Sequence, residues 1–172
     1  MPDSTKQVLY VDLDNTLVDF KSGIGRAHPE LLARHDGDLD EIPGIFATMD
    51  PLPGAIEAYT ELAAHFDTYI LSTAPWANAS AWHDKVLWVQ RHFGFGKDSV
   101  AYKRLILSHH KNLNHGDFLV DDRPNNGASG FAGNWIHFGF DESPGCTAPG
   151  AGCHGTHLPD WAAVTKHLLD RS

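Results

Sequence analysis

Short apolar segments recur along this chain, and each is followed by polar residues or by a segment with helical spacing. The first of them, Val8–Val11, is apolar on both faces, which is typical of a central strand in a parallel sheet. The expected strands are residues 8–11, 68–71, 105–107, 118–120 and 135–138. Strands that alternate with helices indicate an α/β protein wound by crossover connections. We therefore predict a Rossmann-like parallel sheet flanked by helices.

Helical periodicity occupies the segments between and after these strands. We expect one helix over residues 56–66, a second over 82–93 and a third that begins near Pro159. The residues expected to face the core are Trp82, Val86, Val89 and Phe93 in the second helix, and Trp161, Val164 and Leu168 in the third.

Polar side chains follow four of the expected strands. Asp12 and Asp14 come directly after the first, Thr73 after the second, Lys111 after the third, and the pair Asp121–Asp122 after the fourth. In an open α/β sheet the ligand site lies beyond the carboxyl ends of the strands. We therefore expect these residues to meet at one edge of the sheet.

The residue types at this edge point to metal-assisted phosphoryl chemistry. Carboxylate oxygens without thiols or imidazoles suit a hard cation, Mg²⁺ before Zn²⁺. A carboxylate can also attack phosphorus, a lysine and a hydroxyl can hold the phosphoryl oxygens, and a second carboxylate can transfer a proton. Each residue alone is more often a turn, a helix cap or a surface charge. Their joint order and their placement at strand ends favour the catalytic interpretation.

Composition narrows the functional classes. The 172 residues are enough for one domain, and the net charge of −9 disfavours binding to a nucleic-acid polymer. No segment reaches the roughly 18 apolar residues of a membrane span, and residues 1–7 lack an apolar signal region. We therefore expect a cytoplasmic protein that does not enter membranes.

Residues 20–50 differ from the rest of the chain. They are rich in glycine, histidine and charge and poor in core residues, and residues 36–41 are expected to form a solvated acidic turn. We interpret 20–50 as a small cap, inserted into a catalytic core made of residues 1–19 and 51–172.

The order of these motifs resembles the haloacid dehalogenase superfamily of phosphohydrolases. Residues 12–17, Asp-Leu-Asp-Asn-Thr-Leu, look like its first motif, Thr73 like its second, Lys111 like its third and Asp121–Asp122 like its fourth. The resemblance covers nearly the whole chain. It implies a Rossmann-like parallel sheet with a small cap inserted after the first strand.

A finer resemblance points to the 5′(3′)-deoxyribonucleotidase branch of that superfamily. In that branch the residue that matches Phe20 borders the nucleoside pocket. The cap of this chain offers one further aromatic candidate, Phe46, and His109 stands where the branch can carry an arginine. The segments that carry the resemblance are 11–14 with 18–20, 51–58, 73–75 with Lys85 and 88–89, and 119–124.

By this resemblance, Asp12 attacks phosphorus, and Asp14 acts first as general acid and then as general base. Mg²⁺ is held by the Asp12 carboxylate, the backbone carbonyl of Asp14 and Asp122. Asp121 orients Lys111 or the waters of the metal.

The phosphoryl oxygens are held by Thr73 and Lys111, again by resemblance. Phe20, Phe46 and His109 are the further candidates for contact with the substrate, and Trp76 is a weaker one.

The predicted function is therefore that of a Mg²⁺-dependent phosphomonoesterase that forms an aspartyl-phosphate. Its expected substrates are (deoxy)ribonucleoside monophosphates, with the base, the sugar and the phosphate position left open, as is the oligomeric state. One alternative keeps the chemistry and changes the substrate to a sugar phosphate or another small metabolite. A second alternative is a non-catalytic phosphate-binding regulatory protein.

A glycine- and proline-rich segment after the fifth strand contains Cys146, Cys153, His154 and His157. Two thiols and two imidazoles suit a tetrahedral zinc site. A disulfide and a plain surface loop are the other two interpretations, and the last is preferred. None of the phosphoryl chemistry requires this segment, so we expect it not to be catalytic.

Overall fold

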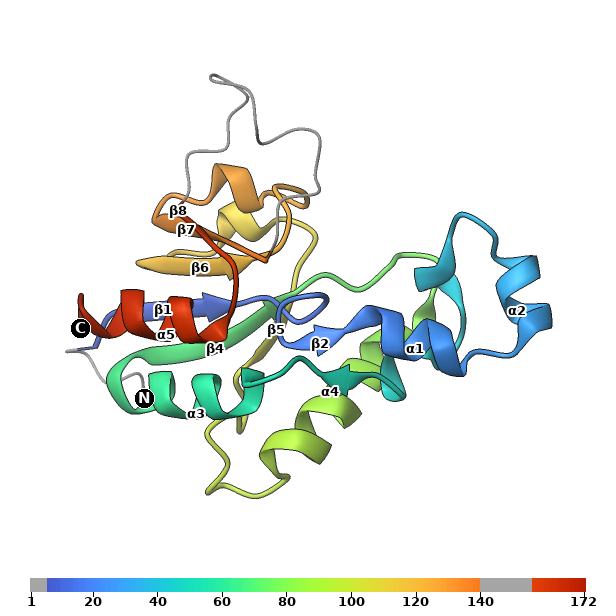
Figure 1. Cartoon of the computed structure of the whole chain (residues 1–172), viewed down its shortest axis with the longest axis horizontal. Coiled ribbons are helices and arrows are strands. Elements are labelled where there is room, and N and C mark those ends of the chain that lie inside the picture. The colour runs from blue at the N-terminus through green and yellow to red at the C-terminus, as the bar shows by residue number, and fades with distance from the viewer. Residues whose placement is uncertain (1–5, 140–155) are drawn as a thin grey trace.

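A computed structural model describes residues 6–139 and 156–172, and its centre is a single parallel sheet. Six strands lie in the order β5-β4-β1-β6-β7-β8, with β1 in the middle (Figure 1). Each neighbouring pair is parallel. The strands are β1 (Val8–Val11), β4 (Asp67–Ser72), β5 (Leu105–Leu107), β6 (Phe118–Asp121), β7 (Asn134–Phe138) and β8 (Thr156–Leu158). This order confirms the predicted Rossmann-like sheet.

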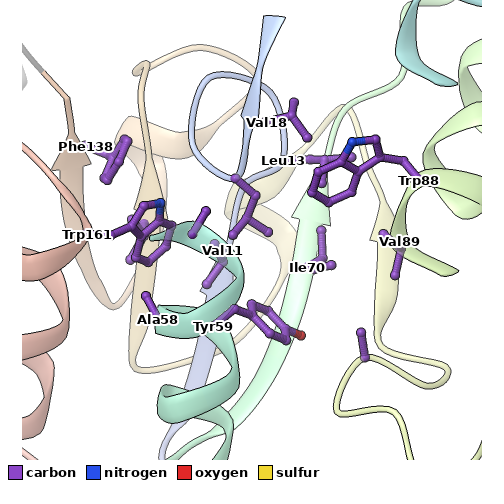
Figure 2. Packing of buried hydrophobic residues seen from close by; sticks show 14 of the residues in the cluster. Val11, Leu13, Val18, Ala58, Tyr59, Ile70, Trp88, Val89, Phe138 and Trp161 are labelled. Carbon is purple, nitrogen blue, oxygen red and sulfur yellow. The ribbon is translucent and has the colours of Figure 1, made fainter. Parts of the chain in front are cut away.

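The two faces of the sheet are covered differently. Alternate residues of a strand point to opposite faces, so Leu9 and Val11 of β1 face the larger hydrophobic cluster and Tyr10 faces the smaller one. The larger cluster receives side chains from α3 (Ala55–His65), α4 (Ala79–Phe93) and α5 (Trp161–Leu169). Figure 2 shows Tyr59, Trp88 and Trp161 from these helices around the β1 and β4 side chains. The smaller cluster includes Ala128 of the 3-10 turn η4 (Ala128–Gly130) and Phe131, which follows this turn.

The last helix agrees with its prediction. Trp161, Val164 and Leu168 are all buried, and Trp161 Nε1 donates to the carbonyl of Thr16 at 2.8 Å. The helix begins after Asp160, whose side chain accepts a hydrogen bond from Ala163 N at 2.9 Å.

The buried face of α4 differs from the prediction. Trp82 and Val86 are each more than a third exposed, although both were expected to face the core. The residues of α4 that are buried are Ala81, Asp84, Lys85, Trp88 and Val89. This face follows helical spacing but includes two charged residues. Their charges have partners, because Asp84 accepts a hydrogen bond from Ser80 and Lys85 pairs with Asp14.

Residues 20–50 contain short helices that project from a two-stranded stem. Strand β2 (Val18–Asp19) pairs antiparallel with β3 (Asp50–Pro51). Figure 1 shows the segment beyond one end of the sheet, beside α4. Between the two strands lie α1 (Phe20–Arg26), α2 (Pro29–Arg34) and the 3-10 turns η1 (Leu39–Glu41) and η2 (Ile45–Ala47).

Helix α4 anchors this segment. Asn78, at the start of the helix, donates through Nδ2 to the carbonyls of Asp40 and Ile42 at 2.9 and 3.0 Å. Trp88 Nε1 donates to Met49 O at 2.8 Å. The larger hydrophobic cluster continues from the sheet into Ile42, Ile45, Phe46 and Met49.

Within the described ranges, no helix has the length and apolar character needed to cross a membrane. Of the cysteine and histidine segment, Cys146, Cys153 and His154 lie outside the described residues. His157 is described and lies on β8. Its ring nitrogen Nε2 is hydrogen-bonded to the carbonyl of Gly139.

Candidate active site

The central strand β1 carries the first two carboxylates to the sheet edge. Asp12 follows the last residue of β1, and its backbone N–H donates to Val120 O of β6 at 2.8 Å. The chain then turns tightly: the amides of Leu17 and Val18 both donate to Leu13 O at 2.9 Å, and Asn15 adopts a left-handed φ of 55°. Asparagine tolerates that conformation better than most residues. The turn fixes Asp12 and Asp14 beside the neighbouring strand ends.

Three carboxylates form a cluster there. One ligand atom from each of Asp12, Asp121 and Asp122 lies within 4.8 Å of the others. Asp121 ends β6, which pairs directly with β1, so the sheet register itself brings the acids together. The carboxylate of Asp14 is not part of this cluster and is instead paired with Lys85.

Lys111 pairs with two of the three carboxylates in this cluster. It begins the 3-10 turn η3 (Lys111–Leu113) and is 3% exposed. Its Nζ lies 2.9 Å from Asp12 Oδ1 and 2.5 Å from Asp121 Oδ2. Burial by itself would lower the pKa of Lys111, but Asp12 and Asp121 outweigh it and raise the pKa. The ammonium therefore stays charged at the point where it meets Asp12.

Lys85 pairs with Asp14 as Lys111 pairs with Asp12. The side chain is fully buried, its Nζ pairs with Asp14 Oδ2 and donates to Ser72 Oγ at 3.1 Å, and it lies 4.3 Å from the centre of the Phe46 ring. Burial nevertheless raises the pKa of Asp14, with the charge of Asp12 acting in the same direction and Lys85 opposing both. This arrangement favours a protonated carboxyl more than an isolated ion pair would.

Electrostatic repulsion among the acids indicates a site for a cation. Burial, followed by the charge of Asp12, raises the pKa of Asp122 to about 7 from an ordinary value of 3.8. Oδ1 of Asp14 and Oδ1 of Asp122 are buried and have no hydrogen-bond partner among the described residues. Buried polar atoms are normally satisfied, and crowded carboxylate oxygens are the ligands that hard divalent cations prefer. The donor set therefore fits a divalent metal ion.

Two further predicted residues join neighbouring loops at this edge. Thr73 Oγ1 donates to Ser108 O at 2.8 Å, and the His109 ring nitrogen Nε2 lies 2.8 Å from Ala74 O. The loop after β4 and the loop after β5 are therefore fixed to each other. Thr73 lies in the same small recess as Asp12, Asp14 and Lys111.

Beside this recess is a larger hollow of about 590 Å³. That size is within the range of about 300–1,000 Å³ that small-molecule sites occupy. Phe46 lines the hollow but is only 3% exposed, since it is part of the larger hydrophobic cluster, and its ring centre lies 5.9 Å from that of Phe20. The lining residues from the sheet side are Asp14, Asn15, Thr73, Pro75, Trp76, His109, Arg123 and Asn126, and those from residues 20–50 are Phe20, Gly37–Glu41 and Phe46.

Sequence reasoning missed several of these residues. Lys85 was noted only as part of a resembling segment, and its contact with Asp14 joins residues 71 positions apart. Residues 36–41 were expected to form a solvated acidic turn, and Asp38 and Asp40 are exposed as expected, but the pattern did not indicate that Asp38, Asp40 and Glu41 line the hollow. Arg123, whose Nε lies 3.3 Å from Asp122 Oδ2, had a signal in its position directly after the two aspartates.

Comparison with known proteins places the chain in a family. Residues 28–143 match the sequence model of the family described as "5' nucleotidase, deoxy (Pyrimidine), cytosolic type C protein". A 5′(3′)-deoxyribonucleotidase homologue from Vibrio phage KVP40 is 50% identical over 167 residues, which cover 97% of this chain and 87% of the phage protein. The chain belongs to the 5′(3′)-deoxyribonucleotidase family. The human cytosolic-type 5′(3′)-deoxyribonucleotidase is 28% identical over 201 residues, with 93% of this chain and 92% of the human protein covered.

Solved structures support the fold of this deoxyribonucleotidase-family chain. The HAD-hydrolase YfnB from Bacillus subtilis, solved with bound magnesium, is similar at a TM-score of 0.64 and 12% identity, over 96% of this chain and 99% of that one. A HAD family hydrolase from Deinococcus radiodurans, solved with bound phosphate and sodium, gives a TM-score of 0.59 and 12% identity over 98% and 97% of the two chains. These likenesses confirm the haloacid dehalogenase fold.

Proposed function

We propose that this chain is a Mg²⁺-dependent phosphomonoesterase that acts on (deoxy)ribonucleoside monophosphates through an aspartyl-phosphate. The observation that carries the proposal is the pairing of Asp12 with a charged, buried Lys111, next to a second acid, Asp14, whose pKa is raised. Asp14 and Thr73 line both the recess that contains Asp12 and Lys111 and the adjoining hollow, which is large enough for a nucleotide. Membership of the deoxyribonucleotidase family supports the choice of substrate.

In the first step Asp12 attacks phosphorus. A bond forms between its carboxylate oxygen and phosphorus, and the bond between phosphorus and the ester oxygen breaks. Lys111 neutralises the charge that develops on the phosphoryl oxygens, and the Thr73 hydroxyl donates to one of these oxygens after its hydrogen turns away from Ser108 O. Lys111 lies against Asp12 in advance, and Asp121 fixes its ammonium at 2.5 Å.

Asp14 supplies and later removes the proton. As general acid it protonates the leaving alkoxide, and as general base it then takes a proton from the water that attacks the aspartyl-phosphate, which releases inorganic phosphate. Its raised pKa supports the acid role, since the group must be protonated when the substrate binds. Lys85 would stabilise the carboxylate once the proton has left.

Asp12, Asp122 and the backbone carbonyl of Asp14 are the groups that would hold Mg²⁺, with Asp121 acting through Lys111. When bound, the ion supplies positive charge that offsets the repulsion between the phosphate and the nucleophile. The magnesium in the structure of YfnB supports this choice of ion. Residues 20–50 are proposed as the cap, with Phe20 and Phe46 on its substrate side and His109 facing the same hollow from the loop after β5.

The net charge of −9 disfavours a nucleic-acid polymer, whereas Lys111 and a metal ion would offset the charge of a single phosphate group. We therefore propose a small phosphorylated partner and no nucleic-acid polymer. A cytoplasmic location is part of the same proposal, in keeping with the cytosolic type of the human relative.

A phosphate-release screen over nucleoside monophosphates and sugar phosphates tests the proposed substrate class. We expect nucleotides to give the highest kcat/KM. If a sugar phosphate outperforms every nucleotide, the phosphatase chemistry survives and the nucleotide assignment fails. Absence of phosphate release from all compounds would favour a phosphate-binding protein instead.

Metal binding should stabilise the protein more at high pH than at low pH. The folded state holds a proton on Asp122 that the unfolded chain gives up near pH 3.8, so this contribution to stability is present below that pH and is lost as the pH rises to about 7. Mg²⁺ takes the place of that proton. Its effect on the melting temperature should therefore be larger at about pH 8 than at about pH 5.5.

Melting curves of the wild type and Asp122→Asn, with Mg²⁺ and with EDTA, provide the measurement. The variant should lose the response to Mg²⁺ and the part of the pH dependence that Asp122 contributes. EDTA should also abolish wild-type activity, and Mg²⁺ should restore it. A magnesium effect of equal size at both pH values would contradict the assignment of Asp122 to the metal site.

Phe20→Ala should lower kcat/KM for nucleotides more than kcat/KM for a small phosphate ester. The ring lines the hollow, and its loss removes apolar contact worth about 1 kcal/mol, or roughly fivefold in kcat/KM. The measurement compares a nucleotide with 2-deoxyribose 5-phosphate, which keeps the sugar and phosphate but lacks the base. Equal losses on both substrates would show that Phe20 serves the fold and not the nucleoside.

A further inference from the structure

One large aromatic side chain at the hollow is left in solvent. Trp76 lines the hollow that also contains Asp14 and Thr73, and 86% of its surface is exposed. An indole has a large apolar face that gains free energy when it is covered. Its position three residues after Thr73 keeps it close to the proposed phosphate site along the chain.

The other aromatic rings of the hollow have little free surface. Residues 20–50 contain only two, Phe20 and Phe46. Phe46 is 3% exposed within the larger hydrophobic cluster, where Phe20 and the Lys85 ammonium contact it, the ammonium at 4.3 Å from its ring centre. Phe20 is itself partly buried against the core. Among the residues that line the hollow, Trp76 therefore offers the largest open aromatic face.

The His109 ring contacts Trp76, yet most of the indole surface stays exposed. The His109 ring lies edge-on to the indole, with centres 6.0 Å apart and planes at 69°. His109 is fixed in turn by Trp82, whose ring centre is 6.0 Å away, and by its contact with Ala74 O. With 86% of its surface exposed, the indole keeps a flat face available for stacking.

We propose that Trp76 is the surface on which the base of the substrate stacks, an inference that rests on the proposed nucleotidase function. Every base has a π-face, so stacking depends on ring area more than on the pattern of hydrogen-bonding edges. A purine has two fused rings and overlaps the indole more than a pyrimidine does. This chain therefore accepts purine nucleotides at least as well as pyrimidine nucleotides.

The kinetic test compares three substrates: dGMP, dTMP and 2-deoxyribose 5-phosphate. Trp76→Ala should lower kcat/KM for dGMP by about 5- to 100-fold, mainly through KM, with a smaller loss for dTMP. The ester that lacks a base should be unaffected, and Trp76→Phe should recover part of the loss. The matched control is Phe95→Ala, which removes an aromatic ring that is 76% exposed and lies outside the hollow.

A binding measurement separates this inference from the proposed reaction. Asp12→Asn is titrated with dGMP and dTMP by calorimetry, with and without the added Trp76→Ala change. The stacking surface is supported if nucleotides bind more tightly with Trp76 than with Trp76→Ala, and if the affinity for dGMP is at least equal to that for dTMP. This result would hold even if the wild type releases no phosphate from nucleotides. The inference is overturned if Trp76→Ala leaves nucleotide binding unchanged, or if it lowers kcat/KM for all three substrates equally.

Discussion

Asp12→Asn is expected to lower phosphate release by roughly 10³-fold or more, because an amide cannot form the acyl phosphate that carries the reaction. The fold should be preserved. The Asn side chain keeps the size of the aspartate, and Lys111 retains its partner Asp121 at 2.5 Å. The charge of Asp12 is also one of the causes that raise the pKa values of Asp14 and Asp122, so its removal relieves repulsion. The metal-free variant should therefore melt at the same temperature as the wild type or higher.

Phosphate release under saturating Mg²⁺, together with a melting curve, measures both parts of this prediction. Asp98→Asn is a matched control, since it makes the same chemical change at an exposed position outside the site. Beryllofluoride, which mimics a phosphoryl group on a carboxylate, should inhibit the wild type and fail to bind the variant. Wild-type activity of Asp12→Asn in EDTA would contradict the aspartyl-phosphate mechanism.

The parts of the fold that sequence could predict are those governed by local pattern. Each expected strand is found, and β1 with its apolar faces is the centre of the sheet. The spacing of Trp161, Val164 and Leu168 was also sufficient to predict α5 and its buried face, because these apolar residues are buried at helical spacing. Strand β8 was not expected, since its three residues, two of them exposed, carry no alternating pattern.

The face of α4 shows where such patterns fail. Hydrophobic periodicity favoured Trp82 and Val86, whereas the helix buries Lys85 instead. A charged side chain is buried only when a partner compensates its charge. That partner, Asp14, comes from a distant part of the sequence, so no local window could contain the signal.

The same distinction applies to the site. The residues at strand ends, Asp12, Thr73, Lys111 and Asp122, could be anticipated to converge because topology alone brings the carboxyl ends of parallel strands together. They do lie in one recess. The walls of the larger hollow depend on how residues 20–50 pack against α4, through contacts such as Asn78 with Asp40 and Ile42. That packing is a tertiary property, and it decides how much of Phe46 and Trp76 a substrate can reach.

Asp14→Asn should separate two kinds of leaving group. As general acid, Asp14 contributes to the departure of an alkoxide, and general acids supply about 10²- to 10⁴-fold in rate. A nucleoside leaves as an alkoxide, so the activity of the variant on nucleotides should fall on that scale. The leaving group of p-nitrophenyl phosphate is a stable anion that needs little protonation, so its release should fall much less.

The comparison must allow for the pairing of Asp14 with Lys85. Lys85 is fully buried, and removal of a partner's charge from a buried pair can destabilise a protein by about 3–5 kcal/mol. The Asn oxygen still accepts from Lys85 Nζ, which limits this loss. The ratio of kcat/KM for the two substrates, measured on one preparation, is independent of the fraction of protein that is folded. A ratio equal to that of the wild type would exclude Asp14 as the general acid, whatever the melting curve shows.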